Sequence, residues 1–300
     1  MRSPETAREL VPDLVAAVQA ELGEGPVWDA STGQLVWVDI LGRRVHRFRP
    51  EDGVDVVVLE TPSDVGAVAP RREGGLVLAL VDGFWLLDPG ATAPRLHRPV
   101  DAARPETRFN DGKVDDDGRF WAGTMAYDQR PGAGSLYRLD RDGRVETMLD
   151  GVTISNGLAW SDDRQTLYYI DTPTRRVDAF DCDPASGAIS GRRTVVQLSD
   201  DQPGSPDGMT IDAEGALWVA LWDGWAVHRY LPDGTLAAVV RMPVARPTSC
   251  TFGGPDLGDL YITSARSDLS PDALVAQPAA GGLFRVRPGT TGRPSTPFAG

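Results

Sequence analysis

Residues 108–125 read RFNDGKVDDDGRFWAGTM, and this stretch joins two kinds of segment. Its front carries Arg108, Asn110 and Asp111, whose side chains can take part in chemistry. Its end is rich in Phe, Trp and Thr, which favour a buried β-strand. The turn between the two, rich in Asp and Gly, is typical of a hairpin. The stretch therefore predicts two antiparallel strands with polar side chains at the start of the first one.

The same pattern returns along the whole chain, and its recurrence decides the fold. The other copies are residues 23–40, 63–80, 155–172, 206–222 and 249–265. Their second strands begin near a large apolar residue every 41 to 50 positions, at Leu35, Leu76, Phe120, Leu167, Leu217 and Leu260. This period is typical of a four-stranded propeller blade. The sequence predicts an all-β fold, a six-bladed β-propeller with four-stranded blades around a central channel, and residues 1–300 form a single domain.

A propeller must also close its ring, and the N-terminal segment LVPDLVAAVQAEL (residues 10–22) is available for this. We expect it to supply an outer strand to the last blade, beside GGLFRVRP (residues 281–288). A helix is the alternative, because Leu10, Leu14, Val15 and Val18 fit one helix face.

The composition limits the classes of partner and compartment. The formal net charge is −13, and an acidic surface repels phosphate groups, so we expect neither nucleic acid nor an anionic membrane as a partner. The start MRSPETAREL lacks the apolar region of a secretory signal, and no apolar run approaches the roughly 20 residues of a membrane helix. We therefore expect a cytoplasmic protein, a monomer or weak homo-oligomer, with Cys182 and Cys250 as free thiols.

Superposition of the copies reveals one equivalent position at the start of each first strand. It is occupied by Glu24, Val65 (after Asp64), Asp111 (after Asn110), Asn156, Asp207 and Ser249. The first strand of a blade lines the channel, so these residues should converge near one mouth. Crowded oxygen-bearing side chains repel one another unless a cation lies between them. Glu24, Asn156 and Asp207 therefore predict a site for a hard divalent ion such as Ca²⁺, Mg²⁺ or Mn²⁺.

Other motifs are better explained by structure. The segments DDDG (115–118) and DRDG (140–143) resemble parts of a calcium loop but lack its downstream Glu, so we interpret them as hairpin turns. The chain has no Gly-x-Ser-x-Gly motif, and its three histidines fall in blade bodies or outer strands, which argues against a Ser-His-Asp hydrolase. The segment WDGW (222–225) follows an inner strand and either packs in the blade or partly faces the mouth.

The sequence resembles the SMP-30/gluconolactonase/LRE family, which includes regucalcin and bacterial sugar lactonases. The resemblance rests on LGEGPVW (22–28), RFNDGKVDDDGRFWAGTM (108–125), ISNGLAWS (154–161), SPDGMTID (205–212) and TFGGPDLGDLYITSA (251–265), in the family's order. It implies a six-bladed propeller with one divalent metal ion in the channel, most simply Ca²⁺, with Mg²⁺, Mn²⁺, Zn²⁺ or Fe²⁺ as alternatives.

The resemblance also assigns roles to single residues. Glu24, Asn156 and Asp207 match the metal ligands, and Asp207 also matches the proposed general base. Arg108 and Asn110 match residues that hold the substrate. Asp128 stands where relatives carry a substrate-contacting Glu, with a side chain one methylene shorter. The family gives no role for Asp111.

The resemblance implies the metal-dependent hydrolysis of a sugar acid lactone, such as gluconolactone, xylonolactone or arabinolactone, to the aldonic acid, because sugar lactones are the family's commonest substrates. The parts suit ester hydrolysis, in which a cation polarises the carbonyl and a carboxylate accepts a proton from water. One alternative is a promiscuous metal-dependent esterase or phosphotriesterase. Another is a calcium-binding propeller without catalytic activity.

Overall fold

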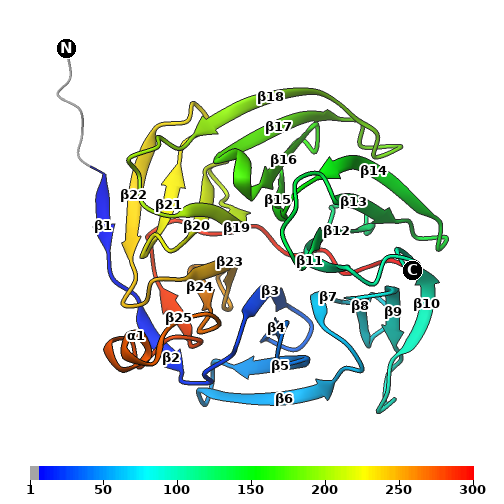
Figure 1. The fold of residues 1–300 in the computed structure, drawn as a ribbon, viewed down its shortest axis with the longest axis horizontal. Coiled ribbons are helices and arrows are strands. Elements are labelled where there is room, and N and C mark those ends of the chain that lie inside the picture. The colour runs from blue at the N-terminus through cyan, green and yellow to red at the C-terminus, as the bar shows by residue number, and fades with distance from the viewer. Residues whose placement is uncertain (1–6) are drawn as a thin grey trace.

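Six sheets surround a central channel in the computed structural model, which describes residues 7–300 (Figure 1). This arrangement confirms the predicted six-bladed propeller. Residues 1–6, part of the predicted domain and of the stretch searched for a secretory signal, lie outside the described residues. Within the described part, the helices are too short or too polar to cross a membrane.

Each blade begins with its innermost strand and proceeds outward. Blade 1 comprises β3 (Gly23–Asp29), β4 (Gln34–Asp39), β5 (Arg44–Arg49) and β6 (Val54–Glu60). Blade 2 comprises β7 (Val65–Pro70), β8 (Leu76–Leu80), β9 (Gly83–Leu87) and β10 (Arg95–Pro99). Blade 3 comprises β11 (Thr107–Val114), β12 (Phe120–Ala126), β13 (Gly134–Leu139) and β14 (Val145–Val152).

The second half of the ring repeats this order. Blade 4 comprises β15 (Ser155–Trp160), β16 (Thr166–Asp171), β17 (Arg176–Cys182) and β18 (Ile189–Gln197). Blade 5 comprises β19 (Ser205–Ile211), β20 (Leu217–Trp222), β21 (Ala226–Tyr230) and β22 (Leu236–Arg241). Blade 6 comprises β23 (Pro247–Gly253), β24 (Asp259–Ser264), β25 (Leu283–Val286) and β2 (Asp13–Ala16). A 3₁₀ turn, η1 (Thr172–Thr174), and a short helix, α1 (Pro271–Ala276), complete the fold.

The N-terminal segment closes the ring as a strand. Strand β2 pairs antiparallel with β25, with Leu14 opposite Phe284, which confirms the expected outer strand of the last blade. The alternative helix does not form there, because β25 offers unpaired backbone groups that outweigh local helix propensity. Strand β1 (Arg8–Leu10), which the sequence did not predict, pairs in parallel with β22 of blade 5. The N-terminal segment thus joins blades 5 and 6.

The acidic turns are hairpin turns, as predicted. The Asp115 carboxylate accepts the backbone N–H groups of Asp117 and Arg119, and its other oxygen accepts the Trp121 indole N–H at 2.9 Å. In blade 5, Asp212 holds the turn before Trp218 in the same way. These carboxylates fix the hairpin and the tryptophan behind it.

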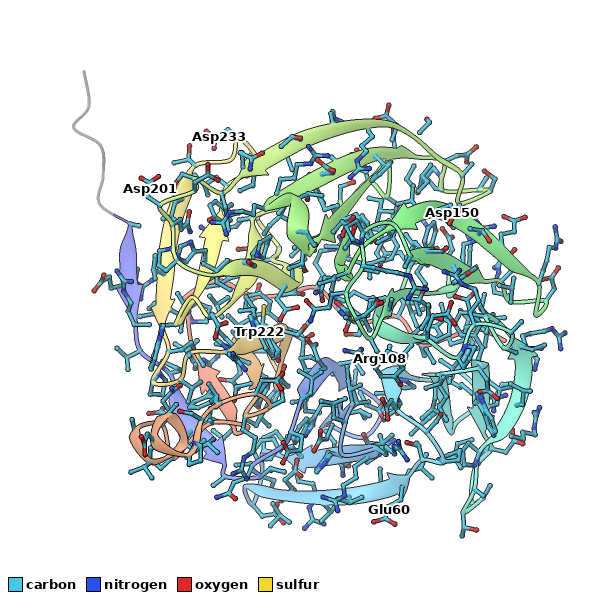
Figure 2. The ribbon with its side chains drawn as sticks, in the orientation of Figure 1. Glu60, Arg108, Asp150, Asp201, Trp222 and Asp233 are labelled. Carbon is cyan, nitrogen blue, oxygen red and sulfur yellow. The ribbon has the colours of Figure 1, made fainter. Side chains whose placement is uncertain are left out.

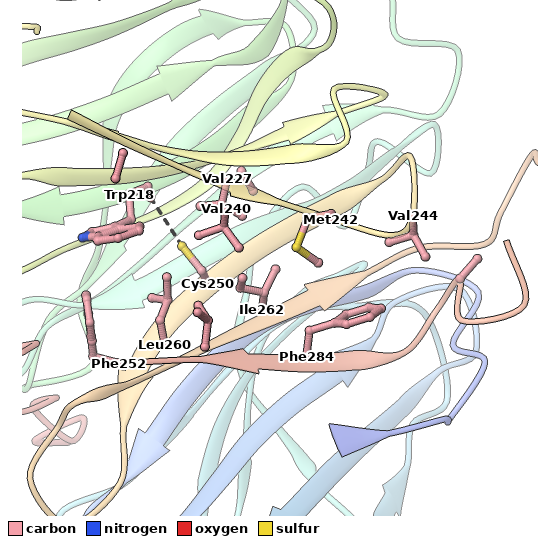
Figure 3. Packing of buried hydrophobic residues seen from close by; sticks show 14 residues of the cluster. Trp218, Val227, Val240, Met242, Val244, Cys250, Phe252, Leu260, Ile262 and Phe284 are labelled. Atoms are coloured by element: carbon pink, nitrogen blue, oxygen red, sulfur yellow. Dashed lines mark hydrogen bonds between the residues drawn. The ribbon is translucent and has the colours of Figure 1, made fainter. Parts of the chain in front are cut away.

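The core lies between the faces of neighbouring blades. Figure 3 shows the cluster between blades 5 and 6, where Trp218 packs near Cys250 and Phe252. The Cys250 thiol donates to the Trp218 carbonyl at 3.4 Å, and burial raises its pKa to about 12. Both cysteines are buried free thiols, as expected.

A C-terminal strap, residues 291–300, closes the base of the channel and crosses the centre of the ring in Figure 1. Its backbone forms hydrogen bonds with the backbone of four blades, at Leu257 of blade 6, Ala213 of blade 5, Gly118 of blade 3 and Pro70 of blade 2. The Arg293 side chain also donates a hydrogen bond to the Trp160 carbonyl of blade 4. A cavity of about 90 Å³ remains between the strap and the inner strands. The channel is therefore covered at its base.

The strap makes a specific prediction about stability. Phe298 is fully buried among apolar side chains of blades 2 and 3. We expect Phe298→Ala to lower the free energy of unfolding by about 3 to 5 kcal/mol, because it leaves a cavity in a packed core. Urea unfolding measures this loss. Val275→Ala, which truncates an exposed side chain in α1, should change the free energy by less than about 0.5 kcal/mol. Equal effects of the two substitutions would contradict a structural role for the strap.

Candidate active site

The inner strands carry the predicted site residues to the same end of the channel. Glu24 lies on β3, Asn156 on β15 and Asp207 on β19, each in the first three residues of its strand. All three side chains are at most 5% exposed. They come from blades 1, 4 and 5, so only closure of the ring brings them together.

A break in register occurs at this position in every inner strand. The breaks lie at Glu24/Val27, Val65/Ala67, Phe109/Asp111, Ser155/Leu158, Pro206/Met209 and Pro247/Cys250. Such bulges bend a strand and re-aim its side chains. A glycine follows the equivalent position in five of the six blades. A Cβ at Gly157 would lie 2.9 Å from the Asp207 carbonyl oxygen, so glycine allows the neighbouring inner strands to approach.

The surroundings of the Glu24 and Asp207 carboxylates destabilise their ionised forms. Burial raises the pKa of Glu24 well above its ordinary value, and the charges of Asp207 and Asp111 raise it further. Burial and the Asp111 charge likewise raise the pKa of Asp207. The Arg108 guanidinium opposes both shifts but does not cancel them. Additional positive charge would therefore stabilise the ionised forms.

Asn156 supplies a third oxygen that lacks a partner. Its Nδ2 donates to Thr172 Oγ1 at 2.8 Å, and this hydroxyl donates in turn to the Pro206 carbonyl at 2.8 Å. These bonds fix the amide, yet its Oδ1 is buried and no donor within residues 7–300 reaches it. Buried polar atoms are rarely left unpaired, so Oδ1 is suited to a ligand.

The three residues together fit a hard divalent cation. Two buried carboxylates and a carboxamide oxygen form the oxygen-only donor set that such ions prefer. No three His, Cys, Asp or Glu side chains gather as a metal site within residues 7–300. A cation in the channel would therefore depend on the Asn156 amide as well as the two carboxylates.

Arg108 and Asn110 lie beside this cluster on β11. Arg108 Nη1 donates to Asn110 Oδ1 at 2.7 Å and to the Phe109 carbonyl at 3.0 Å, while Asn110 Nδ2 donates to the Ser155 carbonyl at 2.9 Å. The amide thus holds the guanidinium against the next inner strand. Figure 2 shows Arg108 beside the central opening. Burial lowers the pKa of Arg108, and its acidic neighbours oppose that shift.

Two further residues extend the site toward the rim. The Tyr127 hydroxyl donates to Asp64 at 2.8 Å, and Arg43 contacts the other oxygen of Asp64 at 2.9 Å. Burial and the Asp64 carboxylate raise the pKa of Tyr127 to about 12. The charges of Tyr127 and Asp64 raise the pKa of Arg108 and so oppose the effect of its burial. The sequence pattern marked Asp64, which precedes the equivalent position in blade 2, but it contained no signal for Tyr127.

The structure does not bring Asp128 into this cluster. Its carboxylate is exposed and pairs with Arg130 at 3.2 Å, and Arg130 also pairs with Glu106. Tyr127, one residue earlier, is the member of this loop that lies near Arg108.

Asp111 faces the channel below the cluster. Its Oδ1 accepts the Gly112 backbone N–H at 2.7 Å, and the Lys113 charge partly offsets the burial that raises the pKa of Asp111. Lys113 Nζ donates to the Met209 carbonyl at 2.7 Å. Both side chains line the cavity above the C-terminal strap.

Comparisons with known proteins identify the family of this chain. The family model described as the SMP-30/Gluconolactonase/LRE-like region matches residues 22–266. Regucalcin of Xenopus laevis is 43% identical over 296 residues, which cover 96% of this chain and 98% of that protein.

Solved structures extend the comparison to the fold. Regucalcin of Agrobacterium tumefaciens, described as a calcium-binding protein, superposes with a TM-score of 0.92 at 31% identity, covering 98% of this chain and 99% of that one. A gluconolactonase from Xanthomonas campestris superposes with a TM-score of 0.71 at 27% identity, covering 91% of this chain and 87% of that one.

Proposed function

Because this chain belongs to the SMP-30/gluconolactonase/LRE-like family, we propose that it is a divalent-cation-dependent lactonase. Its substrate would be a sugar acid lactone, such as gluconolactone, xylonolactone or arabinolactone, and its product the aldonic acid. The observation that carries the proposal is the unpaired Asn156 oxygen among two buried carboxylates, next to a buried arginine. The gluconolactonase name of the Xanthomonas relative supports the substrate class.

Glu24, Asn156 and Asp207 would hold the cation. The calcium-binding description of the Agrobacterium relative supports Ca²⁺. When bound, the ion would polarise the ester carbonyl and offset the negative charge that develops on its oxygen.

The protein's own groups would perform the remaining steps. Asp207, ionised in the loaded site, would take a proton from the water that attacks the ester carbon. Arg108, held by Asn110, would donate hydrogen bonds to substrate oxygens and stabilise the carboxylate that forms. The ring C–O bond then breaks, and the leaving oxygen takes the proton back from Asp207 to become the hydroxyl of the acid, whose new carboxyl group ionises and releases a proton to solvent.

One specific observation favours a second candidate. The Agrobacterium relative is described by calcium binding alone, which fits a calcium-binding propeller without catalysis. That function would need the cation site but not the Arg108–Asn110 pair beside it. A promiscuous esterase would need both, so the two alternatives differ in their dependence on Arg108.

We expect the purified protein to release protons from a panel of aldonolactones, measured in a pH-stat. EDTA should reduce the rate at least about 100-fold, because the site residues then lack the cation they depend on, and one added divalent ion should restore it. Hydrolysis that persists in EDTA would contradict metal dependence. No hydrolysis of any lactone, despite tight Ca²⁺ binding, would support the binding propeller.

Arg108→Ala tests the assigned role of the guanidinium. We expect kcat/KM to fall about 100- to 1,000-fold, because charge-assisted hydrogen bonds to the reacting ester are lost. Ca²⁺ affinity, measured by calorimetry, should stay equal or become tighter, because a positive charge leaves the neighbourhood of Glu24 and Asp207.

Arg144→Ala, on an exposed turn of blade 3, is the matched control and should leave both quantities unchanged. Full activity of Arg108→Ala would show that the assigned role is wrong.

A further inference from the structure

One large aromatic side chain lies at the mouth without a part in the chemistry above. Trp222 ends β20, directly opposite Ser205, the first residue of β19 and two positions before Asp207. Figure 2 shows Trp222 and Arg108 flanking the central opening from opposite sides. Trp222 therefore lies at the same end of the channel as the candidate active site.

The indole also reaches toward the start of blade 1. Trp218 and Ala220, which alternate with Trp222 along β20, belong to the core between blades 5 and 6. Trp222 itself packs against the apolar cluster that contains Leu22 and Ala265. Leu22 bridges Ala265 and stands two residues before Glu24. The side chain therefore lies between the segments that carry Asp207 and Glu24.

The indole ring of Trp222 is held in place from one side. The Arg246 guanidinium lies over it, with the guanidinium carbon 4.6 Å from the ring centroid. Arg246 is itself held by Asp223 at 2.7 Å and by the Ser267 carbonyl. This stacking orders the indole before any ligand arrives, so little conformational entropy is left to lose on binding.

The rest of the side chain remains available. Trp222 is only half-buried, whereas Trp37, Trp121 and Trp218 are fully buried. The indole N–H groups of those three tryptophans donate to Asp55, Asp115 and Asp212, but no acceptor within residues 7–300 takes that of Trp222. A rigid, half-open indole with a free donor is the kind of surface that binds a ring bearing both C–H and hydroxyl groups.

We propose that Trp222 is a substrate-contacting residue that forms an aromatic wall of the mouth and packs against the C–H face of the lactone ring. This inference rests on the proposed function and deepens it, because the wall favours cyclic polyhydroxylated esters over small open-chain ones. Arg108 binds oxygen atoms from the opposite side, so the ring lies between a polar group and an apolar one.

The test measures binding separately from turnover. Gluconolactam keeps the ring and hydroxyls of gluconolactone but resists hydrolysis, and calorimetry on the Ca²⁺-loaded protein gives its Kd. We expect Trp222→Ala to weaken binding about tenfold and Trp222→Phe to weaken it less than about threefold, because phenylalanine keeps an aromatic face. In lactone turnover, Trp222→Ala should raise KM about tenfold with kcat within about twofold.

Trp225→Ala is the matched control, since Trp225 lies in the same turn with its side chain 44% exposed. It should leave Kd and KM unchanged. Unchanged gluconolactam binding in Trp222→Ala, or no binding to the unmodified protein, would overturn the proposal. If gluconolactam binding depends on Trp222 while no lactone is hydrolysed, the substrate-contacting role of Trp222 is supported and the proposed lactonase function is contradicted.

Discussion

Buried carboxylates repel one another at the channel mouth, and the inner strands of the propeller hold them there against that repulsion. Glu24 and Asp207 are withdrawn from water, and each also feels the charge of Asp111. A buried charge without compensation is costly, and the single nearby guanidinium does not balance this cluster. A ligand that supplies positive charge would offset this cost, and it could also pair with the buried Oδ1 of Asn156, which no donor within residues 7–300 reaches.

The propeller provides the rigidity that this arrangement requires. Each inner strand is bulged at its site position, so the six blades direct their side chains to one axis. The N-terminal strands join blades 5 and 6, and the C-terminal strap covers the base. With the ring tied at both ends of the chain, the site residues cannot relax apart to relieve their repulsion. The fold thus keeps these oxygen atoms at one end of the channel.

The architecture and the convergence of three polar residues at one end of the channel were predictable from the sequence because both depend on the repeat. Apolar strands separated by Asp- and Gly-rich turns identify a blade, and superposing the blades aligns Glu24, Asn156 and Asp207. The outer strand β2 was also predictable, because the last blade lacked a partner for β25. Strand β1 was not, since three residues pairing in parallel with a distant strand leave no local pattern.

The residues at the rim of the mouth could not be predicted from the repeat. Loop residues there are placed by contacts between blades, so the family resemblance selected Asp128, which pairs with Arg130 outside the cluster. Tyr127 and Trp222 reach the mouth through partners that are remote in sequence, Asp64 and Arg246. The fixed amide that leaves Asn156 Oδ1 unpaired likewise depends on Thr172 and Pro206, which only the folded ring assembles.

Anomalous diffraction would locate a divalent ion bound at the channel mouth. Crystals grown with Mn²⁺ would be measured on both sides of the manganese absorption edge. We expect a single strong anomalous peak within coordination distance of Glu24, Asn156 Oδ1 and Asp207. A peak that lies elsewhere, or no peak in the channel at saturating Mn²⁺, would contradict it.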